Sequence, residues 1–529
     1  MFSAIFMLVL FSASAVIANE KVLICYYGTW ATYRWGKGKF DVETIDPNLC
    51  THLIYTFIGI KSEGTVVSLD PYLDLAENWG RGNFNKFTAL KSKNPKLKTL
   101  LAVGGWNEGS AKYSIMSANA AYRQNFIQSA LKMIQDHGFD GLDVDWEYPN
   151  RRDTVNGAAD IDNFTQLLKE LREEFDKHDL LLTAAVSSVE ASASLSYNVG
   201  AISKYLDFIN LMTYDMYGSW DPVTGHNAPL HSGEGDKSAD PNSLYTVDMA
   251  INYWLKAGCP PEKLIMGVPF YGRTFSLTNP DVNSVRAPAS GAGIAGQYTA
   301  TNGFIGYNEF CQKLQTESWT VKTDEKAKVP YAIQNRNWVS YDNPSSLVIK
   351  TEYAMSLNLG GVMVWSIETD DFNGLCGEGD FPLLRTLNKA LRRNIPESTT
   401  ESSDTSSTDG SDTSSIYPDT TSTTEASDTS STDADITSTT GDDTSSEQPS
   451  SDAPPTSDSS SSSPTTSAPD AICVAEGFAA NPLDCSSYYM CVHQSDGSFR
   501  SFQFRCPFNL RWEQDTFTCN YPELVDCTV

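Results

Sequence analysis

The feature that most constrains the fold is a series of eight short apolar runs separated by helical stretches. The runs cover residues 21–28, 51–60, 98–106, 139–149, 180–188, 206–215, 263–272 and 360–368. Between them, residues 120–138 and 161–178 repeat apolar side chains every three or four positions, which predicts amphipathic helices. Strands buried on both faces read as continuous apolar runs, so eight of them alternating with helices predict an α/β fold, a (β/α)8 TIM barrel. The seventh interval is too long for one helix, so residues 274–345 are expected to form an inserted subdomain.

A segment of different composition follows the predicted barrel of residues 19–395. It covers residues 396–470, and positions 401–470 hold 39 Ser or Thr, 15 Asp or Glu and no basic residue. Such a sequence cannot bury an apolar core, so it predicts a disordered linker. In an exported protein this composition also indicates O-glycosylation, and a plain flexible linker is the alternative.

The final segment, residues 471–529, is rich in cysteine. It holds six of the eleven cysteines: Cys473, Cys485, Cys491, Cys506, Cys519 and Cys527. A module this short buries too little core to be stable alone, so we predict a disulfide framework. The sequence has no Cys-x-x-Cys pair, which disfavours zinc, and no metal is expected. Six cysteines allow fifteen connectivities, and the odd total leaves at least one thiol unpaired within the chain.

The first residues indicate export. An apolar core is followed by Val16 and Ala18, which occupy the −3 and −1 positions of a signal cleavage site. A membrane anchor is the alternative, but the apolar stretch is short and ends in polar residues. We therefore predict a signal peptide over residues 1–18, a secreted extracellular protein, and no membrane attachment after the signal is removed.

The net charge of −28 excludes one class of partner. Nucleic-acid binding needs a basic face for the phosphates, so no nucleic acid is expected as a partner. An anionic membrane surface is disfavoured for the same reason.

Three carboxyl groups share one face of the fourth predicted strand. In DGLDVDWEYP, strand alternation points Asp143, Asp145 and Glu147 one way, about 6–7 Å apart, and the intervening apolar residues the other way. Buried together, these groups cannot all ionise, so the set shares protons and titrates as a unit. Glu147 lies nearest the carboxyl end of the strand, where barrel active sites open, and a protonated acid there suits glycosidic bond cleavage. A calcium loop and a solvated acidic stripe are the alternatives, and the interleaved apolar residues disfavour both.

These residues resemble a known enzyme family. DGLDVDWEYP is similar to the DxxDxDxE signature of family 18 glycoside hydrolases, the chitinases. Residues 102–106 (AVGGW), 212–218 (MTYDMYG) and 363–368 (MVWSIE) resemble the family's third-, sixth- and eighth-strand motifs, in the same order. The resemblance implies a TIM barrel with an α+β insertion.

The resemblance also implies roles for five residues. Glu147 is expected to be the general acid, Asp145 to orient the substrate acetamido group, and Asp143 to share the proton. Tyr214 and Asp215 are expected to bind the acetamido group and stabilise positive charge. The implied mechanism retains anomeric configuration through the substrate's own N-acetyl oxygen, and no cofactor is expected.

Aromatic residues near the strand ends predict a sugar-binding cleft. Trp30, Trp106, Trp220 and Trp365 lie at or beyond the predicted carboxyl ends, and indole faces stack on pyranose rings. The substrate contacts implied by position and resemblance are Tyr27, Trp30, Asp70, Pro71, Gly104, Gly105, Trp106, Asn107, Tyr148, Met212, Thr213, Tyr214, Asp215, Trp220, Tyr271, Arg273, Met363 and Trp365.

The cysteine-rich module resembles a peritrophin-A type chitin-binding domain. The resemblances imply the pairs Cys473–Cys491, Cys485–Cys527, Cys506–Cys519, Cys25–Cys50 and Cys311–Cys376, which leaves Cys259 free. The aromatic residues of the cysteine-rich module are expected to supply a binding surface; they are Tyr488, Tyr489, Phe504, Trp512 and Tyr521. Asn163 is the only N-glycosylation acceptor pattern.

The whole chain is thus expected to be a monomeric, secreted endochitinase that binds chitin and chitooligosaccharides. A non-catalytic chitin-binding lectin or cuticle protein is the alternative. The presence of Glu147 favours the enzyme, since lectins that resemble this family lose that residue.

Overall fold

The computed structural model describes residues 20–233, 235–236, 244–395, 473, 477–493, 498–506, 511–513, 518–520 and 525. The predictions for the signal peptide, residues 1–18, and for the linker, residues 396–470, lie outside these described residues. The chain divides into two compact units, residues 1–407 and 408–529, which are described separately.

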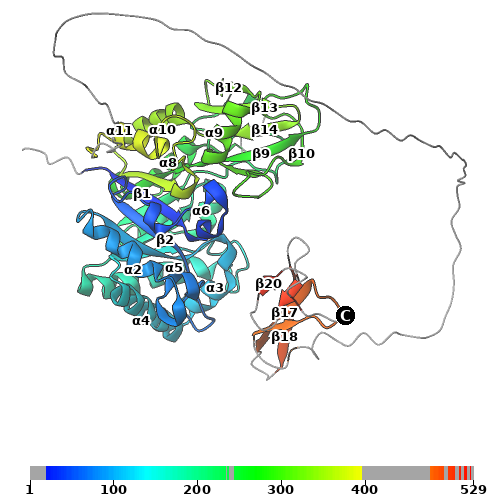
Figure 1. Ribbon diagram of the computed structural model, residues 1–529. Helices are drawn as coiled ribbons and strands as arrows, with labels where there is room; N and C mark the ends of the chain where they lie inside the picture. Colours follow the sequence, from blue (N-terminus) through cyan, green and yellow to red (C-terminus); the bar gives the residue numbers. More distant parts are fainter. Residues whose placement is uncertain are drawn as a thin grey trace, which may run out of the picture. The chain divides into compact units, whose positions relative to one another are not determined.

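The first unit is built on a closed parallel barrel (Figure 1). Its strands are β1 (Val22–Gly28), β2 (His52–Ile60), β4 (Lys98–Gly104), β5 (Gly141–Asp145), β6 (Leu181–Ser187), β7 (Phe208–Met212), β8 (Leu264–Pro269) and β15 (Gly361–Trp365). β1 pairs with both β2 and β15, which closes the ring, and each of the eight predicted runs contains one strand of the barrel. The predicted TIM barrel is confirmed. A short strand, β3 (Val66–Ser68), adds to β2 in antiparallel orientation.

Helices fill the connections between the barrel strands. They are α1 (Pro71–Asp74), α2 (Asn83–Ala89), α3 (Ala111–Ala118), α4 (Ala120–His137), α5 (Ala159–Phe175), α6 (Glu190–Ser196), α7 (Val199–Ile202), α8 (Val247–Lys256), α10 (Pro344–Ser356) and α11 (Pro382–Ala390). The sequence sets the limits of α4 locally: Asn119 accepts hydrogen bonds from two amides of the first turn, and Gly138 ends the helix at φ 71°. None of the described helices is long and apolar enough to cross a membrane.

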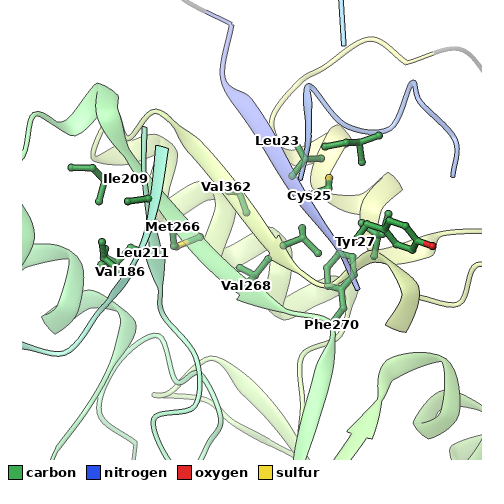
Figure 2. Packing of buried hydrophobic residues seen from close by; sticks show 14 of the residues in the cluster. Leu23, Cys25, Tyr27, Val186, Ile209, Leu211, Met266, Val268, Phe270 and Val362 are labelled. Atoms are coloured by element: carbon green, nitrogen blue, oxygen red, sulfur yellow. The ribbon is translucent and has the colours of Figure 1, made fainter. Parts of the chain in front are cut away.

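Side chains alternate between two hydrophobic layers. The outer layer packs the barrel against the helices, and Figure 2 shows part of it, with residues from β1, β6, β7, β8 and β15. The inner layer fills the barrel and includes Ile24, Tyr26, Ile54, Leu100 and Met363. Along β1, Leu23, Cys25 and Tyr27 belong to the outer layer, whereas Ile24 and Tyr26 point into the barrel.

The chain between β8 and α10 forms a separate antiparallel sheet (Figure 1). It comprises β9 (Tyr271–Leu277), β10 (Ala289–Ala292), β11 (Phe304–Gly306), β12 (Thr320–Asp324), β13 (Val329–Gln334) and β14 (Asn337–Ser340), with α9 (Tyr307–Thr316) after β11. A single residue separates the end of β8 from the first strand of this sheet, which begins at Tyr271. The insertion therefore starts at the mouth of the barrel.

The second unit contains a three-stranded and a two-stranded antiparallel sheet. The strands are β16 (Gly477–Ala480), β17 (Ser487–His493), β18 (Phe499–Arg505), β19 (Arg511–Glu513) and β20 (Thr518–Asn520). The Trp512 ring is buried and stacks on Tyr488, with ring centroids 3.9 Å apart. Trp512 therefore packs inside the module, and the prediction that it forms part of the binding surface is corrected. Tyr489 is half-buried, whereas the side chain of Phe504 and residue Tyr521 lie outside the described part of the chain.

Disulfides join residues in both units. The structure contains Cys25–Cys50, Cys311–Cys376 and Cys473–Cys491, and Cys259 is buried as a free thiol. Cys485 and Cys506 are also disulfide-bonded, but the side chains of Cys519 and Cys527 lie outside the described residues. Among the described residues, one cluster brings potential metal-ligating atoms together, namely those of Cys311, Asp371 and Cys376. The two cysteines form a disulfide, so neither offers a thiolate to a metal.

Candidate active site

The acidic motif spans the length of β5 and continues beyond it. Asp140 lies before the strand and accepts hydrogen bonds from the Lys91 ammonium and the Thr99 amide, both at 2.8 Å. Asp143 and Asp145 lie on the strand with buried side chains, and Glu147 follows its carboxyl end and is half-buried. Asp140 therefore belongs to the opposite end of the barrel, while the other three carboxyl groups lead into the mouth.

A polar cluster inside the barrel holds Asp143. The Tyr26 hydroxyl donates to Asp143 at 2.8 Å, the Asn210 amide donates at 3.1 Å, and the Thr183 hydroxyl donates as well. Burial raises the pKa of Asp143 to about 6, although these three hydrogen bonds oppose the shift. Tyr26 was missed by the sequence analysis, because both faces of β1 are apolar and its sequence does not show which residues point into the barrel.

Burial and mutual repulsion keep protons on the rest of the set. The pKa of Asp145 is raised well above its usual value by burial, then by the charges of Glu147 and Asp143. Burial raises the pKa of Glu147 to about 7, and the Asp215 charge adds to the increase. Asp145 also has a buried carboxyl oxygen with no hydrogen-bond partner among the described residues. An acid that is protonated near neutral pH therefore stands next to a carboxyl group free to bind a ligand.

Two glycines allow the end of β4 to pass close to the backbone of Asp145. Gly104 and Gly105 have φ values of 120° and 85°, and the Gly105 amide donates to the Asp145 carbonyl oxygen at 2.8 Å. A Cβ atom on Gly104 would lie 2.0 Å from that oxygen. A side chain at this position is thus excluded by both space and backbone conformation. The next residues, Trp106 and Asn107, are exposed.

Asp215 is fixed by the insertion. Arg273 donates through Nε and pairs through Nη2 with its two carboxylate oxygens, each at 2.7 Å, and the Tyr271 hydroxyl donates at 2.7 Å. Asp215 itself has a left-handed backbone, with a φ of 57°, and the Asn227 side chain accepts a hydrogen bond from its backbone amide at 2.9 Å. The first strand of the insertion therefore supplies a forked cation and a phenol that orient this carboxylate.

Aromatic rings form a layer beside these acids. The Trp365 ring lies 5.6–6.0 Å from the centroids of Tyr26, Phe57 and Trp30. Trp30, Trp106 and Trp220 keep 42%, 56% and 59% of their surfaces exposed, so their rings are available to a ligand. Tyr214 donates its hydroxyl to the Met363 sulfur at 3.7 Å, next to the same layer. Phe57 was missed by the sequence analysis because its run is uniformly apolar.

Residues 22–370 match the model of the Glycosyl hydrolases family 18, and residues 473–527 match the Chitin binding Peritrophin-A domain. The chain belongs to glycosyl hydrolase family 18. It is 44% identical over 409 residues to "Probable chitinase 2" of Drosophila melanogaster, covering 72% of this chain and 82% of that protein.

Solved structures of a chitinase and of a pseudo-chitinase are similar to this chain. An Ostrinia furnacalis group IV chitinase, crystallised with allosamidin, is 64% identical and covers 70% of this chain and 99% of its own, with a TM-score of 0.69. Human YKL-39, described as a pseudo-chitinase that retains chitooligosaccharide binding, is 40% identical and covers 70% and 100%, with a TM-score of 0.64.

The family 18 barrel does not bring every predicted contact to the mouth. Tyr27 is buried in the outer layer, where its ring lies 5.7 Å from Phe40, so the prediction that it contacts sugar is corrected. The Thr213 side chain is also buried and donates to the Gly267 carbonyl oxygen at 2.6 Å, which makes it structural. Both errors arise because an apolar strand sequence does not show which face a residue takes.

The other predicted contacts occupy varied positions in the family 18 unit. Asp70 caps α1 by accepting from the Leu73 amide at 3.0 Å, and it accepts from the exposed Tyr33 hydroxyl at 2.6 Å. Pro71 is exposed, and Tyr148 is half-buried beside Glu147. Met212 is half-buried against the inner layer. Asn163 is half-buried within α5.

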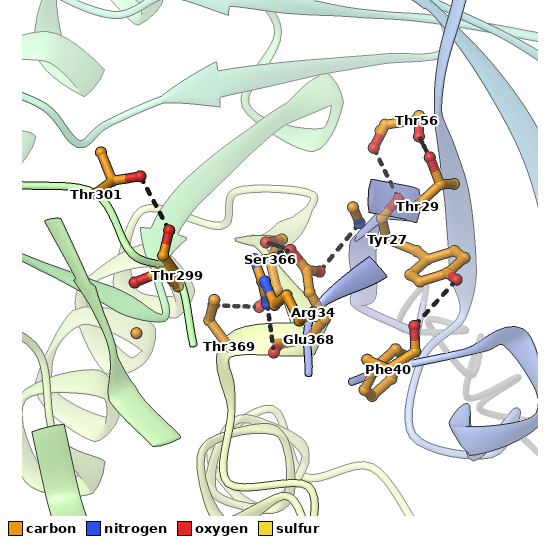
Figure 3. Close-up of polar contacts among 12 residues, drawn as sticks. Tyr27, Thr29, Arg34, Phe40, Thr56, Thr299, Thr301, Ser366, Glu368 and Thr369 are labelled. Atoms are coloured by element: carbon orange, nitrogen blue, oxygen red, sulfur yellow. Dashed lines mark hydrogen bonds and ion pairs between the residues drawn. The ribbon is translucent and has the colours of Figure 1, made fainter. Parts of the chain in front are cut away.

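A buried carboxylate joins the two strand ends that carry Trp30 and Trp365. Glu368 accepts from the Gly28 amide at 3.0 Å and from the Ser366 hydroxyl at 2.6 Å, and it lies 3.7 Å from the Arg34 guanidinium (Figure 3). Glu368 therefore fixes the ends of β1 and β15 with respect to each other. Sequence reasoning missed this role, because the bonded groups are 340 residues apart.

Proposed function

We propose that this family 18 hydrolase is a secreted endochitinase that cleaves β-1,4 bonds between N-acetylglucosamine units with retention of configuration. The observation that carries the proposal is the proton-sharing set formed by Asp143, Asp145 and Glu147 at the barrel mouth. It combines a protonated acid with a neighbouring carboxyl group that can bind an acetamido group.

In the proposed reaction, Glu147 donates its proton to the glycosidic oxygen, and the leaving sugar departs with that proton. The carbonyl oxygen of the substrate's N-acetyl group attacks the anomeric carbon as the bond breaks, which forms a cyclic oxazolinium ion. Asp145 binds the acetamido N–H and stabilises the positive charge. Water then attacks the anomeric carbon and gives a proton to the Glu147 carboxylate, so the product keeps the original anomeric configuration.

The surrounding residues support this chemistry. Tyr214 and the anchored Asp215 lie where they can hold the acetamido group, and the Trp365 layer offers a floor for the sugar ring. The exposed rings of Trp106 and Trp220 suit a cleft that binds several sugars, which favours attack within a chain. The C-terminal module would hold the enzyme on insoluble chitin and raise the local substrate concentration.

The decisive experiment is product analysis on chitin hexamer with the unaltered protein and with Glu147→Gln. Short β-anomeric oligomers from the unaltered protein, and a loss of turnover of about 10³-fold or more in the variant, are expected. Retained turnover in Glu147→Gln would reject its role as the acid. Deletion of residues 397–529 should preserve cleavage of the hexamer and weaken cleavage of insoluble chitin, and an equal loss on both would reject the tether.

The second candidate is a chitin-binding lectin without catalysis. It is favoured by one comparison, since human YKL-39 is described as a pseudo-chitinase with retained chitooligosaccharide binding. Tight hexamer binding without products from the unaltered protein would support the lectin. The raised pKa of Glu147 favours the enzyme, because a purely binding site has no need of a protonated acid.

A further inference from the structure

The loop after Glu147 places a cation against the exposed indole of Trp106. The Cζ atom of Arg152 lies 3.9 Å from the centroid of the Trp106 ring, and its Nη1 donates to the Trp106 carbonyl oxygen at 2.5 Å. The guanidinium therefore covers one face of the indole and is bonded to the backbone of the same residue. Because Trp106 remains 56% exposed, a ligand can still reach the ring. Cation–π contact and a charge-assisted hydrogen bond together restrict where the indole can lie.

The loop itself holds Arg152 in place. Asn150 and Asp153 have φ values of 59° and 47°, so the chain turns sharply on either side of the arginine pair. The Asn150 side-chain amide donates to the Leu195 carbonyl oxygen at 2.9 Å, and the Arg152 Nε atom lies 3.3 Å from the Asp153 carboxylate. The Arg152 side chain is only 29% exposed, which agrees with a constrained position rather than a freely solvated charge.

The same contacts lead to the general acid. Burial and the Asp215 charge raise the pKa of Glu147, whereas a hydrogen bond from the Tyr148 side chain, the Arg152 charge and a hydrogen bond from the Trp106 backbone amide lower it. Displacement of Trp106 would therefore alter both the stacking surface and the proton affinity of the acid. The titratable and charged groups that act on Glu147 or are coupled to it are Asp145, Tyr148, Arg152, Tyr197, Tyr214 and Asp215.

We propose that Arg152 is a positioning residue that fixes the Trp106 indole as the stacking platform for a sugar next to the scissile bond and couples this platform to Glu147. The inference rests on the proposed function, because it assigns a role within the same site. Arg152 acts through Trp106 and through its charge, and not by contact with the reacting atoms.

The chain offers a matched control for this role. Arg151 is the adjacent residue and its side chain is exposed, so Arg151→Gln and Arg152→Gln remove the same charge from neighbouring positions. Arg152→Gln is expected to raise KM for chitin hexamer about three- to tenfold with a smaller change in kcat, because it loses a contact of about the cation–π size. It should also move the alkaline limb of the kcat/KM profile to higher pH, because removal of the cation raises the pKa of the acid. Arg151→Gln should change neither.

Arg152→Lys separates the two effects. Lysine keeps the positive charge but lacks the planar group, so the alkaline limb should stay close to that of the unaltered protein while KM remains raised. If Arg152→Gln matches Arg151→Gln in both KM and pH profile, the proposal is overturned.

A double-mutant cycle tests whether Arg152 acts through Trp106. In a Trp106→Ala background, the effect of Arg152→Gln on KM should disappear, whereas an undiminished effect would overturn the positioning role. Hexamer binding measured calorimetrically in a Glu147→Gln background gives the same comparison without turnover. Failure of the unaltered protein to cleave would therefore reject the proposed function, while the binding cycle would still decide the role of Arg152.

Discussion

The two faces of β5 have opposite chemistry although they belong to one five-residue strand. On the outer face, Leu142 and Val144 are fully buried in the layer between barrel and helices. On the inner face, Asp143 and Asp145 are equally buried but carry carboxyl groups. Each buried apolar side chain stabilises the fold by about 1.5–3 kcal/mol, whereas a buried carboxylate is costly unless it is protonated or bonded. Strand alternation thus separates the face that stabilises β5 from the face that carries chemistry.

Among substitutions within β5, Asp145→Asn should give the largest effect, and it should act on the inner face alone. The amide cannot stabilise the positive charge of the oxazolinium ion, so kcat is expected to fall about 10²–10³-fold. Steady-state kinetics on chitin hexamer measure this loss. The free energy of unfolding should change little, because a neutral amide replaces a carboxyl group that burial already keeps protonated. A large loss of stability would contradict the separation of the two faces.

Leu142→Ala should affect the outer face alone. Removal of a fully buried side chain that packs on the helices is expected to lower the free energy of unfolding by about 2–5 kcal/mol. Urea unfolding of the full chain measures the change, and kcat of the folded variant should stay within about twofold of its original value. Ile349→Ala, at a residue that is 38% exposed, serves as the control and should change stability little.

The pH dependence of stability tests the inner face in another way. Burial raises the pKa of Asp143 from 3.8 to about 6, so the folded state binds its proton more tightly than the unfolded state. The resulting stabilisation is fully present below pH 3.8 and is lost as the pH rises through about 6. Unfolding measured from pH 4 to pH 8 should therefore show a smaller decline with rising pH in Asp143→Asn than in the unaltered protein. An identical decline would show that Asp143 is not a source of this dependence.

Asp140→Asn should give the smallest effect and sharpens the comparison along the strand. Asp140 bonds Lys91 and Thr99 before β5 begins, and its side chain is partly exposed. Loss of this ion pair should lower the free energy of unfolding by about 1 kcal/mol and leave kcat unchanged. A large loss of kcat would mean that the first acid of the motif also takes part in the reaction.

The fold was predictable because buried parallel strands leave long apolar runs in the sequence. The limits of those runs were less exact: the run at 139–149 contains a strand only over Gly141–Asp145. The remainder continues as the loop that carries Glu147 and Tyr148 into the mouth. Apolar and aromatic residues serve both a strand and an active-site loop, so composition does not mark the boundary.

The face of a strand on which each residue lies was harder to predict than the strand itself. Tyr26 and Tyr27 are chemically identical neighbours, yet one donates to Asp143 inside the barrel and the other packs on Phe40 outside it. In β5 the alternation of acids and apolar residues showed the phase directly. In β1 both faces are apolar, and pairing with β2 and β15 decides which residue points inward.

The sequence alone was sufficient to predict the shared face of Asp143, Asp145 and Glu147, because a two-residue period is a local property of an extended chain. Contacts between distant residues required the tertiary structure. Arg152 reaches Trp106 across 46 residues, Arg273 reaches Asp215 across 58, and Glu368 reaches Gly28 across 340. The pKa values of the acids depend on burial and on such neighbours, and both exist only after the barrel has closed.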